Sequence, residues 1–308
     1  MWCFTPLHIV NAEGWYMRIV AWKARYLGAL MLAVGFAVIA GLPSEVRTAE
    51  AQTPGAGLIG LTKDNRLVRF SPSDPSRLLG SVQITGVVFG EQLLGIDYRP
   101  ATGQLYALSS FDKLYTINAT TGVASQVAVA SGTLVDGGLL GGEFGFDFNP
   151  VPDRIRVVSD TRQNLRLNPV TGALAATDGR LIYAFDDVFE GITPRVVGAA
   201  YTNSVAGATT TTNYAIDAAT NALVTQGSLN GSPVSPNTGQ LFTVGTLGVA
   251  PVGPVGFDIA PNGTAYAAMI PDGYQVSELY TINLSTGRAS RIGTIGSGFV
   301  IIGLAVMP

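Results

Sequence analysis

Short runs in which apolar and polar residues alternate follow one another along the chain from residue 58 to the end. Residues 104–108, 113–117 and 278–282 are examples, and all three contain a Leu-Tyr pair. Thr-Gly or Asn-Gly turns separate many of these runs. A period of two between turn residues is typical of short antiparallel β-strands. The pattern therefore predicts an all-β chain.

One phrase, Gly-x-Asp followed by a proline, recurs about every fifty residues and divides the chain into units. It occurs at residues 95–100, 145–150 and 256–261, and weaker copies occur at 198–203 and 303–308. After each of the three full copies come a turn, a second run, a third run, a polar hairpin and a fourth run. Four strands in about fifty residues is the size of one propeller blade.

The two ends of this repeat complete each other. Residues 58–61, 66–70 and 77–84 form three runs without the leading phrase, and residues 303–308 form the phrase with nothing after it. We therefore predict a β-propeller of about five four-stranded blades, with the C-terminal strand pairing with the N-terminal blade and closing the ring. Four or six blades are the alternatives, because residues 209–212 and 213–216 do not separate cleanly into two strands. A β-solenoid would have shorter repeats and no split first unit.

Several phrases in the repeat resemble a known family. Residues 145–150, 164–169, 197–203 and 206–212 are similar to the bacterial exported family DUF4394. The resemblance extends over nearly all of residues 57–307 and is most specific in the central third. It implies propeller-type repeats, export and no assigned activity. Some relatives carry a C-terminal sorting helix; the sequence ends at Pro308 without one, so retention by that route is not expected.

Residues 17–51 have the three parts of a secretory signal. A basic start at residues 17–25 precedes an apolar run at 27–42, and Ala49 and Ala51 give a small-x-small cleavage pattern. The apolar run is shorter than the roughly 20 residues of a membrane-spanning helix. Cleavage is therefore favoured, and an uncleaved anchor, the sole expected membrane contact, is the alternative. We expect residues 1–51 to be an upstream extension plus signal peptide, and residues 52–308 to be a single periplasmic or extracellular propeller domain.

Composition narrows the chemistry of the mature part. All cysteine, histidine and tryptophan residues precede the cleavage pattern, at Trp2, Cys3, His8, Trp15 and Trp22. Their absence from residues 52–308 excludes thiol and imidazole catalysis, disulfides and the usual zinc or copper sites. The chain is weakly acidic, with a formal net charge of −3 and no basic stripe, so nucleic acid is not an expected partner. We expect a monomer.

The aspartate of the repeated phrase is the leading candidate site. Asp97, Asp147 and Asp258 occupy the same position in three units, where the other two units have Ala200 and Ala305. The first strand of a propeller blade lines the central channel, so these carboxylates are expected to converge if they face it. Three converging carboxylates would suit Ca²⁺, and no other cofactor is expected. Alternatively, each aspartate accepts hydrogen bonds from turn amides and holds its blade in register.

Blade three contains two further candidate groups. Arg154 and Arg156 share one strand face and could clamp an anion, or they could pair with the nearby acids. The acids of this region could supply the carboxylate pair of a glycoside hydrolase. If the protein is a hydrolase, the repeated aspartates Asp147, Asp258 and Asp97 are the catalytic candidates. Outside blade three, Ser109 with Lys113 is a weak candidate dyad. The acidic group comprises Glu143, Asp147, Asp153, Asp160, Asp178, Asp186, Asp187 and Glu190.

The favoured functional hypothesis is an exported, noncatalytic module that binds an extracellular ligand or protein. Loops at the two ends of the ring, together with the channel, would form the recognition surfaces. A carboxylate-based glycoside hydrolase acting on envelope or environmental glycans is the first alternative. A structural role in an envelope or matrix assembly is the second.

Overall fold

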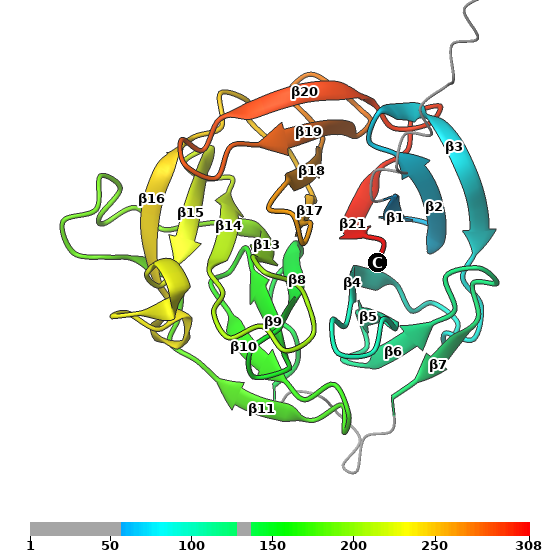
Figure 1. The fold of residues 1–308 in the computed structure, drawn as a ribbon, viewed down its shortest axis with the longest axis horizontal. Helices are drawn as coiled ribbons and strands as arrows, with labels where there is room; N and C mark the ends of the chain where they lie inside the picture. The colour runs from blue at the N-terminus through cyan, green and yellow to red at the C-terminus, as the bar shows by residue number, and fades with distance from the viewer. Residues whose placement is uncertain (1–56, 128–136) are drawn as a thin grey trace, which may run out of the picture. The chain divides into compact units, whose positions relative to one another are not determined.

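The computed structural model describes residues 57–127 and 137–308, whose strands form five sheets arranged in a ring (Figure 1). This confirms the predicted β-propeller of five blades. The expected signal segment at residues 17–51 lies outside the described residues. Within the described part of the chain, no helix combines the length and apolar character of a membrane span.

In each blade, the first strand lies nearest the centre of the ring and the fourth lies at its perimeter (Figure 1). Blade 1 contains β21 (Ile301–Val306), β1 (Leu58–Thr62), β2 (Arg66–Ser71) and β3 (Asp74–Gln83). Blade 2 contains β4 (Leu93–Tyr98), β5 (Leu105–Ser109), β6 (Leu114–Ile117) and β7 (Ala124–Gln126). Blade 3 contains β8 (Phe144–Asn149), β9 (Arg154–Ser159), β10 (Asn164–Leu167) and β11 (Leu174–Thr177). Blade 4 contains β13 (Val196–Tyr201), β14 (Asn213–Asp217), β15 (Ala222–Gln226) and β16 (Gln240–Thr246), and blade 5 contains β17 (Gly256–Ile259), β18 (Ala265–Met269), β19 (Glu278–Ile282) and β20 (Ala289–Thr294).

The two ends of the propeller meet in blade 1. Strand β21 pairs antiparallel with β1, with Leu58 opposite Val306 and Leu61 opposite Gly303. The last strand of the chain is therefore the innermost strand of the first blade. This pairing confirms the predicted closure, which leaves the repeat without an open end.

The hydrophobic core consists of five clusters, one at each junction between neighbouring blades. Strand β5 shows how the sequence builds them. Leu105 and Ala107 pack toward blade 1, whereas Tyr106 and Leu108 pack toward blade 3. Successive side chains of a strand point to opposite faces, so an all-apolar strand serves two junctions at once.

Blade 4 is the irregular unit, as the sequence suggested. Residues 209–212 lie in the loop before β14, so the ambiguous stretch provides one strand rather than two. A fifth strand, β12 (Ile182–Tyr183), pairs in parallel with the outside of β16. The hairpin between β15 and β16 contains two short 3-10 helices, η1 (Leu229–Gly231) and η2 (Pro236–Thr238). The sequence pattern did not predict β12.

The polar hairpins before the fourth strands share one local structure. The side-chain oxygen of Asn118 accepts hydrogen bonds from the amides of Thr120 and Thr121, and Gly122 follows with a φ of 75°. Asn168 and Asn283 make equivalent bonds in blades 3 and 5. An asparagine four residues before a glycine therefore encodes this turn, because asparagine can bond the turn amides and glycine tolerates positive φ.

Candidate metal centre and channel mouths

Each innermost strand carries a glycine where it passes close to the innermost strand of the next blade. A Cβ atom on Gly145 would lie 2.6 Å from the nitrogen of Ala199, and one on Gly256 would lie 2.8 Å from the nitrogen of Leu304. Only glycine fits such a backbone approach. Because residues i and i+2 of a strand point the same way, the residue two positions after each glycine also faces the next blade. That position is the repeated aspartate in three of the strands and alanine in the other two.

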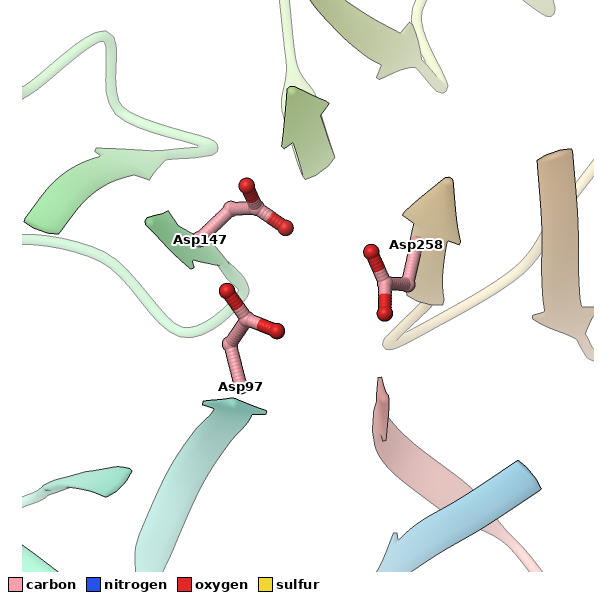
Figure 2. A group of neighbouring side chains, drawn as sticks. All are labelled: Asp97, Asp147 and Asp258. Carbon is pink, nitrogen blue, oxygen red and sulfur yellow. The ribbon is translucent and has the colours of Figure 1, made fainter. Parts of the chain in front are cut away.

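Asp97, Asp147 and Asp258 converge near the axis of the ring, as Figure 2 shows. One oxygen of each carboxylate lies within 4.8 Å of the corresponding oxygens of the other two. The three residues are 3%, 1% and 4% exposed, respectively. None of the ion pairs among the described residues includes them. The structure thus brings together the three residues that the sequence singled out.

Each aspartate accepts a hydrogen bond from the backbone of the next innermost strand. Asp97 in β4 accepts one from the amide of Phe148 in β8 at 2.8 Å. Asp147 in β8 accepts one from Tyr201 in β13 at 3.0 Å. Asp258 in β17 accepts one from Val306 in β21 at 2.6 Å. The edge of an innermost strand has no neighbouring strand on the channel side, so these carboxylates satisfy amides that would otherwise lack partners.

Two of the aspartates also bond the next amide in their own strand. Asp97 accepts a bond from Tyr98 at 2.6 Å, and Asp258 accepts one from Ile259 at 2.6 Å. The preceding blades have alanine at the aspartate position, Ala305 before Asp97 and Ala200 before Asp258. Where the previous blade has alanine instead of aspartate at this position, the aspartate therefore also accepts a hydrogen bond from an amide of its own strand.

Three carboxylates in this way satisfy five equivalent amides, one from each innermost strand. These bonds use both oxygens of Asp97, both oxygens of Asp258 and Oδ1 of Asp147. No hydrogen bond from the described residues reaches Oδ2 of Asp147. The expected structural role is thus present in a modified form: the amides belong to neighbouring strands rather than to turns. One oxygen is left over.

Burial raises the pKa values of all three carboxyls, and repulsion from neighbouring carboxylates adds to the rise for Asp97 and Asp147. For Asp97, burial is the largest cause, the charge of Asp258 adds to it, and the two amides offset part of the effect. For Asp147, burial is again first, followed by the charges of Asp97 and Asp258. Burial raises the pKa of Asp258 to about 6, against the opposing effect of its two amides. Carboxylates this close need protons or a cation between them.

The geometry of this aspartate triad fits an oxygen-ligated cation. Two oxygens bound to the same Ca²⁺ at about 2.4 Å lie at most about 4.8 Å apart. The triad oxygens meet that limit. Each of the bonded oxygens has a further lone pair, and Asp147 has the additional free oxygen. Asp97, Asp147 and Asp258 are thus the residues that would hold a cation here.

The two arginines of blade three have different surroundings. Arg156 is 1% exposed, and its guanidinium donates to Tyr201, Asn164, Asp178 and Asn237 at 2.6 to 3.2 Å. Arg154 is half-buried and donates to backbone carbonyls of the turn before it. The two share a strand face, as expected, but the groups that surround Arg156 are internal ones. This network joins blade 3 to blade 4.

The acids of blade three are dispersed rather than gathered in one pocket. Asp153 pairs with Arg99, and Asp178 pairs with both Arg156 and Arg166. Asp187 accepts hydrogen bonds from the amide and hydroxyl of Thr243 at 2.7 Å. The partners of these carboxylates lie at different blade junctions and loops, so the carboxylates do not line a common site.

Glu91 forms a buried network that the sequence did not single out. Its carboxylate accepts hydrogen bonds from the hydroxyls of Ser109 and Tyr115 and from the amide of Val88, and Lys113 lies 3.6 Å away. Ser109 and Lys113 are thus near each other, as their spacing suggested, but the serine hydroxyl donates to Glu91. Nothing in the local sequence around Glu91 marks these distant partners.

Comparison with known proteins places the chain in a family. The family model described as a domain of unknown function, DUF4394, matches residues 66–305. The chain belongs to the DUF4394 family. A search of curated protein sequences gives no match.

Three solved structures are similar to this DUF4394 chain at low sequence identity. Dihydro-heme d1 dehydrogenase NirN in complex with DHE is 14% identical with a TM-score of 0.35, over 85% of this chain and 48% of that one. The nidogen/laminin complex is 12% identical with a TM-score of 0.47, over 82% and 99%. A structural genomics protein of unknown function from Bacteroides thetaiotaomicron VPI-5482 is 12% identical with a TM-score of 0.45, over 80% and 62%. The chain spans about half the length of the first of these, and similarity of this degree identifies neither a ligand nor an activity.

The DUF4394 propeller has a cavity at each end of its axis. The Asp97 cavity, of about 260 Å³, is lined by Asp97, Asp258, Arg99 and Met307 among others. The Glu143 cavity, of about 500 Å³, lies where the innermost strands begin. Between them, at the level of the glycines, the space is about 10 Å³, roughly that of one water molecule.

The lining of the Glu143 cavity is both apolar and polar. Its apolar part includes Leu94, Phe144, Ile270, Val300 and Ile302, and its polar part consists of Lys63, Gln92, Glu143 and Gln275. Sequence reasoning placed Glu143 in an acidic group but did not find Lys63, Gln92 or Gln275. Lys63 and Gln275 lie in loops within blades 1 and 5, whereas Gln92 and Glu143 lie in the segments that lead into β4 and β8. The four residues are far apart in the sequence, so only the ring brings them together.

Proposed function

We propose that this DUF4394 propeller is an exported, noncatalytic binding module that takes a small ligand in the Glu143 cavity. The cavity lies on the axis of the ring and receives side chains from blades 1, 2, 3 and 5. Loops that meet at one end of a rigid ring are a common place for recognition.

The observation that carries this proposal is the combination of size and lining. A volume of about 500 Å³ falls within the roughly 300–1,000 Å³ of small-molecule sites. Such sites are mostly apolar and contain a few polar groups that fix the orientation of the ligand. The Glu143 cavity has an apolar wall and four polar side chains.

The arrangement of carboxylates supports binding over glycoside hydrolysis. Hydrolysis needs two carboxyl groups about 5–9.5 Å apart that face the same sugar. Among the described residues that line the Glu143 cavity, Glu143 is the only carboxylate. The aspartates of the triad are buried, and five of their six oxygens already accept backbone hydrogen bonds.

A fragment screen with matched variants tests this proposal. Gln275→Trp adds an indole at the exposed rim of the cavity, and Gln126→Trp adds one at an exposed position on the outer strand β7. Fragments that raise the melting temperature of the wild type should lose their effect in Gln275→Trp and keep it in Gln126→Trp. The absence of any fragment with this behaviour would overturn the cavity proposal, and glycan turnover abolished by Asp147→Asn would overturn its noncatalytic part.

Export is part of the proposal, supported by the secretory pattern at residues 17–51. Expressed in a bacterial host, the full chain should yield a mature monomer beginning near Gln52 in the periplasm or the medium. Mass spectrometry of each fraction and size-exclusion chromatography check this. A full-length cytoplasmic product would contradict it.

Calcium at the aspartate triad is a second candidate property. It is favoured because, within the described part of the chain, Oδ2 of Asp147 has no hydrogen-bond donor and the triad has no cationic side-chain partner. Calcium would then link three innermost strands, which is a structural role. Calcium added to chelator-treated protein should raise the melting temperature of the wild type but not that of Asp147→Asn. Equal melting temperatures with calcium and with chelator would exclude the site.

A further inference from the structure

Glu143 forms part of the wall of the Glu143 cavity, and one oxygen of its carboxylate is buried without a hydrogen-bond donor. Its Oε2 atom is buried and has no hydrogen-bond partner among the described residues. Among the described residues, its ion-pair partner is Arg195, whose Nη1 lies 3.7 Å from Oε2, beyond hydrogen-bond distance. A buried carboxylate oxygen that lacks a donor is costly, and a native structure seldom leaves one without a reason.

The surroundings of Glu143 favour a cationic partner. Burial raises the pKa of the Glu143 carboxyl, Arg195 lowers it, and Asp160 raises it again. The side chain is 16% exposed and forms part of the cavity wall. The exposed part of the Glu143 side chain therefore faces the cavity, whereas Oε2 lies behind it. A ligand cation there would lie against a negative charge that Arg195 compensates only in part.

The rest of the cavity wall is largely apolar and favours a ligand with an apolar portion. Leu94, Phe144 and Ile302 lie in the innermost strands next to Glu143, and Ile270 and Val300 extend the apolar wall. These side chains belong to rigid strands or their immediate ends, so the wall is preformed. An apolar chain or ring of a ligand would lose its contact with water there.

We propose that the Glu143 cavity binds a small apolar amine, with its ammonium group on the Glu143 carboxylate and its apolar part on Leu94, Phe144 and Ile302. An ammonium group has three donors and a full positive charge, so it can bond the carboxylate and neutralise it. Arg195 is 42% exposed on its side chain, so it can move into solvent when the ammonium arrives. This inference rests on the proposed binding function and specifies the ligand class of that site.

Three probes with the same apolar chain isolate the role of charge: hexylammonium, hexan-1-ol and hexanoate. Isothermal titration calorimetry at pH 7 and constant ionic strength should show hexylammonium binding about tenfold more tightly than hexan-1-ol, because a charge-assisted bond replaces a neutral one. Hexanoate should bind most weakly. Binding of hexanoate as tight as that of hexylammonium, or no detectable binding of hexylammonium, overturns the inference.

Two variants and a control assign the effect to Glu143. Glu143→Gln keeps the size of the side chain and should remove about tenfold of the hexylammonium affinity, while the affinity for hexan-1-ol stays unchanged. Glu190→Gln, in an exposed loop, should behave as the wild type. Arg195→Gln removes the competing cation and should strengthen hexylammonium binding, which tests the inference even if Glu143→Gln does not fold.

The outcomes separate this inference from the proposed function. If Gln275→Trp weakens all three probes and Glu143→Gln weakens none, the cavity is a binding site but its ligand is not an amine. If Gln275→Trp changes the binding of no probe, the cavity proposal fails, and the amine inference fails with it.

Discussion

Glu91 and the aspartate triad are both buried carboxylate sites of the same ring, but their partners differ. Glu91 receives hydrogen bonds from two side-chain hydroxyls and one amide, and Lys113 supplies a positive charge nearby. Among the residues that the structure describes, the triad accepts hydrogen bonds only from backbone amides, and each aspartate lies beside two other acids.

The pKa values of the two sites move in opposite directions as a result. Burial is the largest single effect on Glu91 and raises its pKa. The hydrogen bonds to the carboxylate, with those from Ser109 and Tyr115 first, and the charge of Lys113 together outweigh burial, so the net pKa is lowered. For Asp97 and Asp147, burial and repulsion outweigh the amides, and the pKa values rise well above the ordinary range. Burial alone therefore does not decide the protonation of a carboxylate in this fold; the number and charge of its donors do.

Removal of the Glu91 carboxylate is expected to have the largest effect. Glu91→Ala leaves two buried hydroxyls, the Val88 amide and the Lys113 ammonium without their acceptor. The free energy of unfolding should fall by about 3 kcal/mol, as for other broken buried networks. Urea denaturation measures this change.

The exposed residue Glu190 provides the control for this variant. Glu190→Ala should change the free energy of unfolding by no more than about 0.5 kcal/mol. Equal effects of Glu91→Ala and Glu190→Ala would mean that the Glu91 network does not contribute to stability.

Conversion of single triad aspartates to asparagine should change the free energy of unfolding differently for each aspartate, depending on whether one or both of its oxygens accept amide hydrogen bonds. Both oxygens of Asp97 accept amides, so Asp97→Asn places an NH₂ group against an amide donor and should cost about 2 kcal/mol. Asp147→Asn can keep the bond from Tyr201 on its oxygen and turn its NH₂ group toward the other carboxylates. In calcium-free protein at neutral pH, it should stabilise the fold by about 1 kcal/mol.

Asp258→Asn completes this series. It has the same two-amide pattern as Asp97 and should destabilise the protein to a similar extent. Chemical denaturation of the three variants in chelator gives the comparison. If all three substitutions changed the free energy of unfolding in the same direction, Asp147 would not differ from Asp97 and Asp258 in having one oxygen without an amide donor.

The sequence predicted the ring because the repeat is local and occurs in every unit. Gly95 and Asp97 lie two residues apart in one strand, and the same spacing at Gly145 and Asp147 implies the same place in the next blade. Propeller symmetry then brings equivalent positions to the axis. The split first unit, with residues 303–308 completing residues 58–84, was also visible in the chain alone.

The features that the sequence did not predict depend on contacts that occur once in the ring and are not repeated from blade to blade. Glu91 meets Tyr115 across 24 positions, and Arg156 meets Asn237 across 81, and neither pair recurs in other blades. Strand β12 comprises two residues, which is too short for a periodic pattern. The sequence also left open whether the aspartates bond turns or face the channel, and the structure shows that they face the channel and bond neighbouring strands.

The pH dependence of stability is the smallest and most specific difference between the two sites. The folded pKa of each triad aspartate lies above its unfolded value of about 3.9. The contribution of the triad to the free energy of unfolding is therefore fully present below about pH 3.9. It is lost as the pH rises through the folded pKa values, about 6 for Asp258. The folded pKa of Glu91 lies below its unfolded value, so its contribution is present above about pH 4.3 and is lost as the pH falls.

These directions of pKa shift predict how the stability advantage of Asp147→Asn, its free energy of unfolding minus that of the wild type, varies with pH. In chelator, this advantage should shrink by about 1 kcal/mol between pH 8 and pH 5, because protons relieve the same repulsion in the wild type. Asp272→Asn, at an exposed turn, should show no such trend and serves as the control. Urea denaturation at pH 5, 6, 7 and 8 measures the difference. An advantage that stays constant, or grows on acidification, would mean that the triad aspartates are ionised throughout this range and that the amides, not the repulsion, dominate the site.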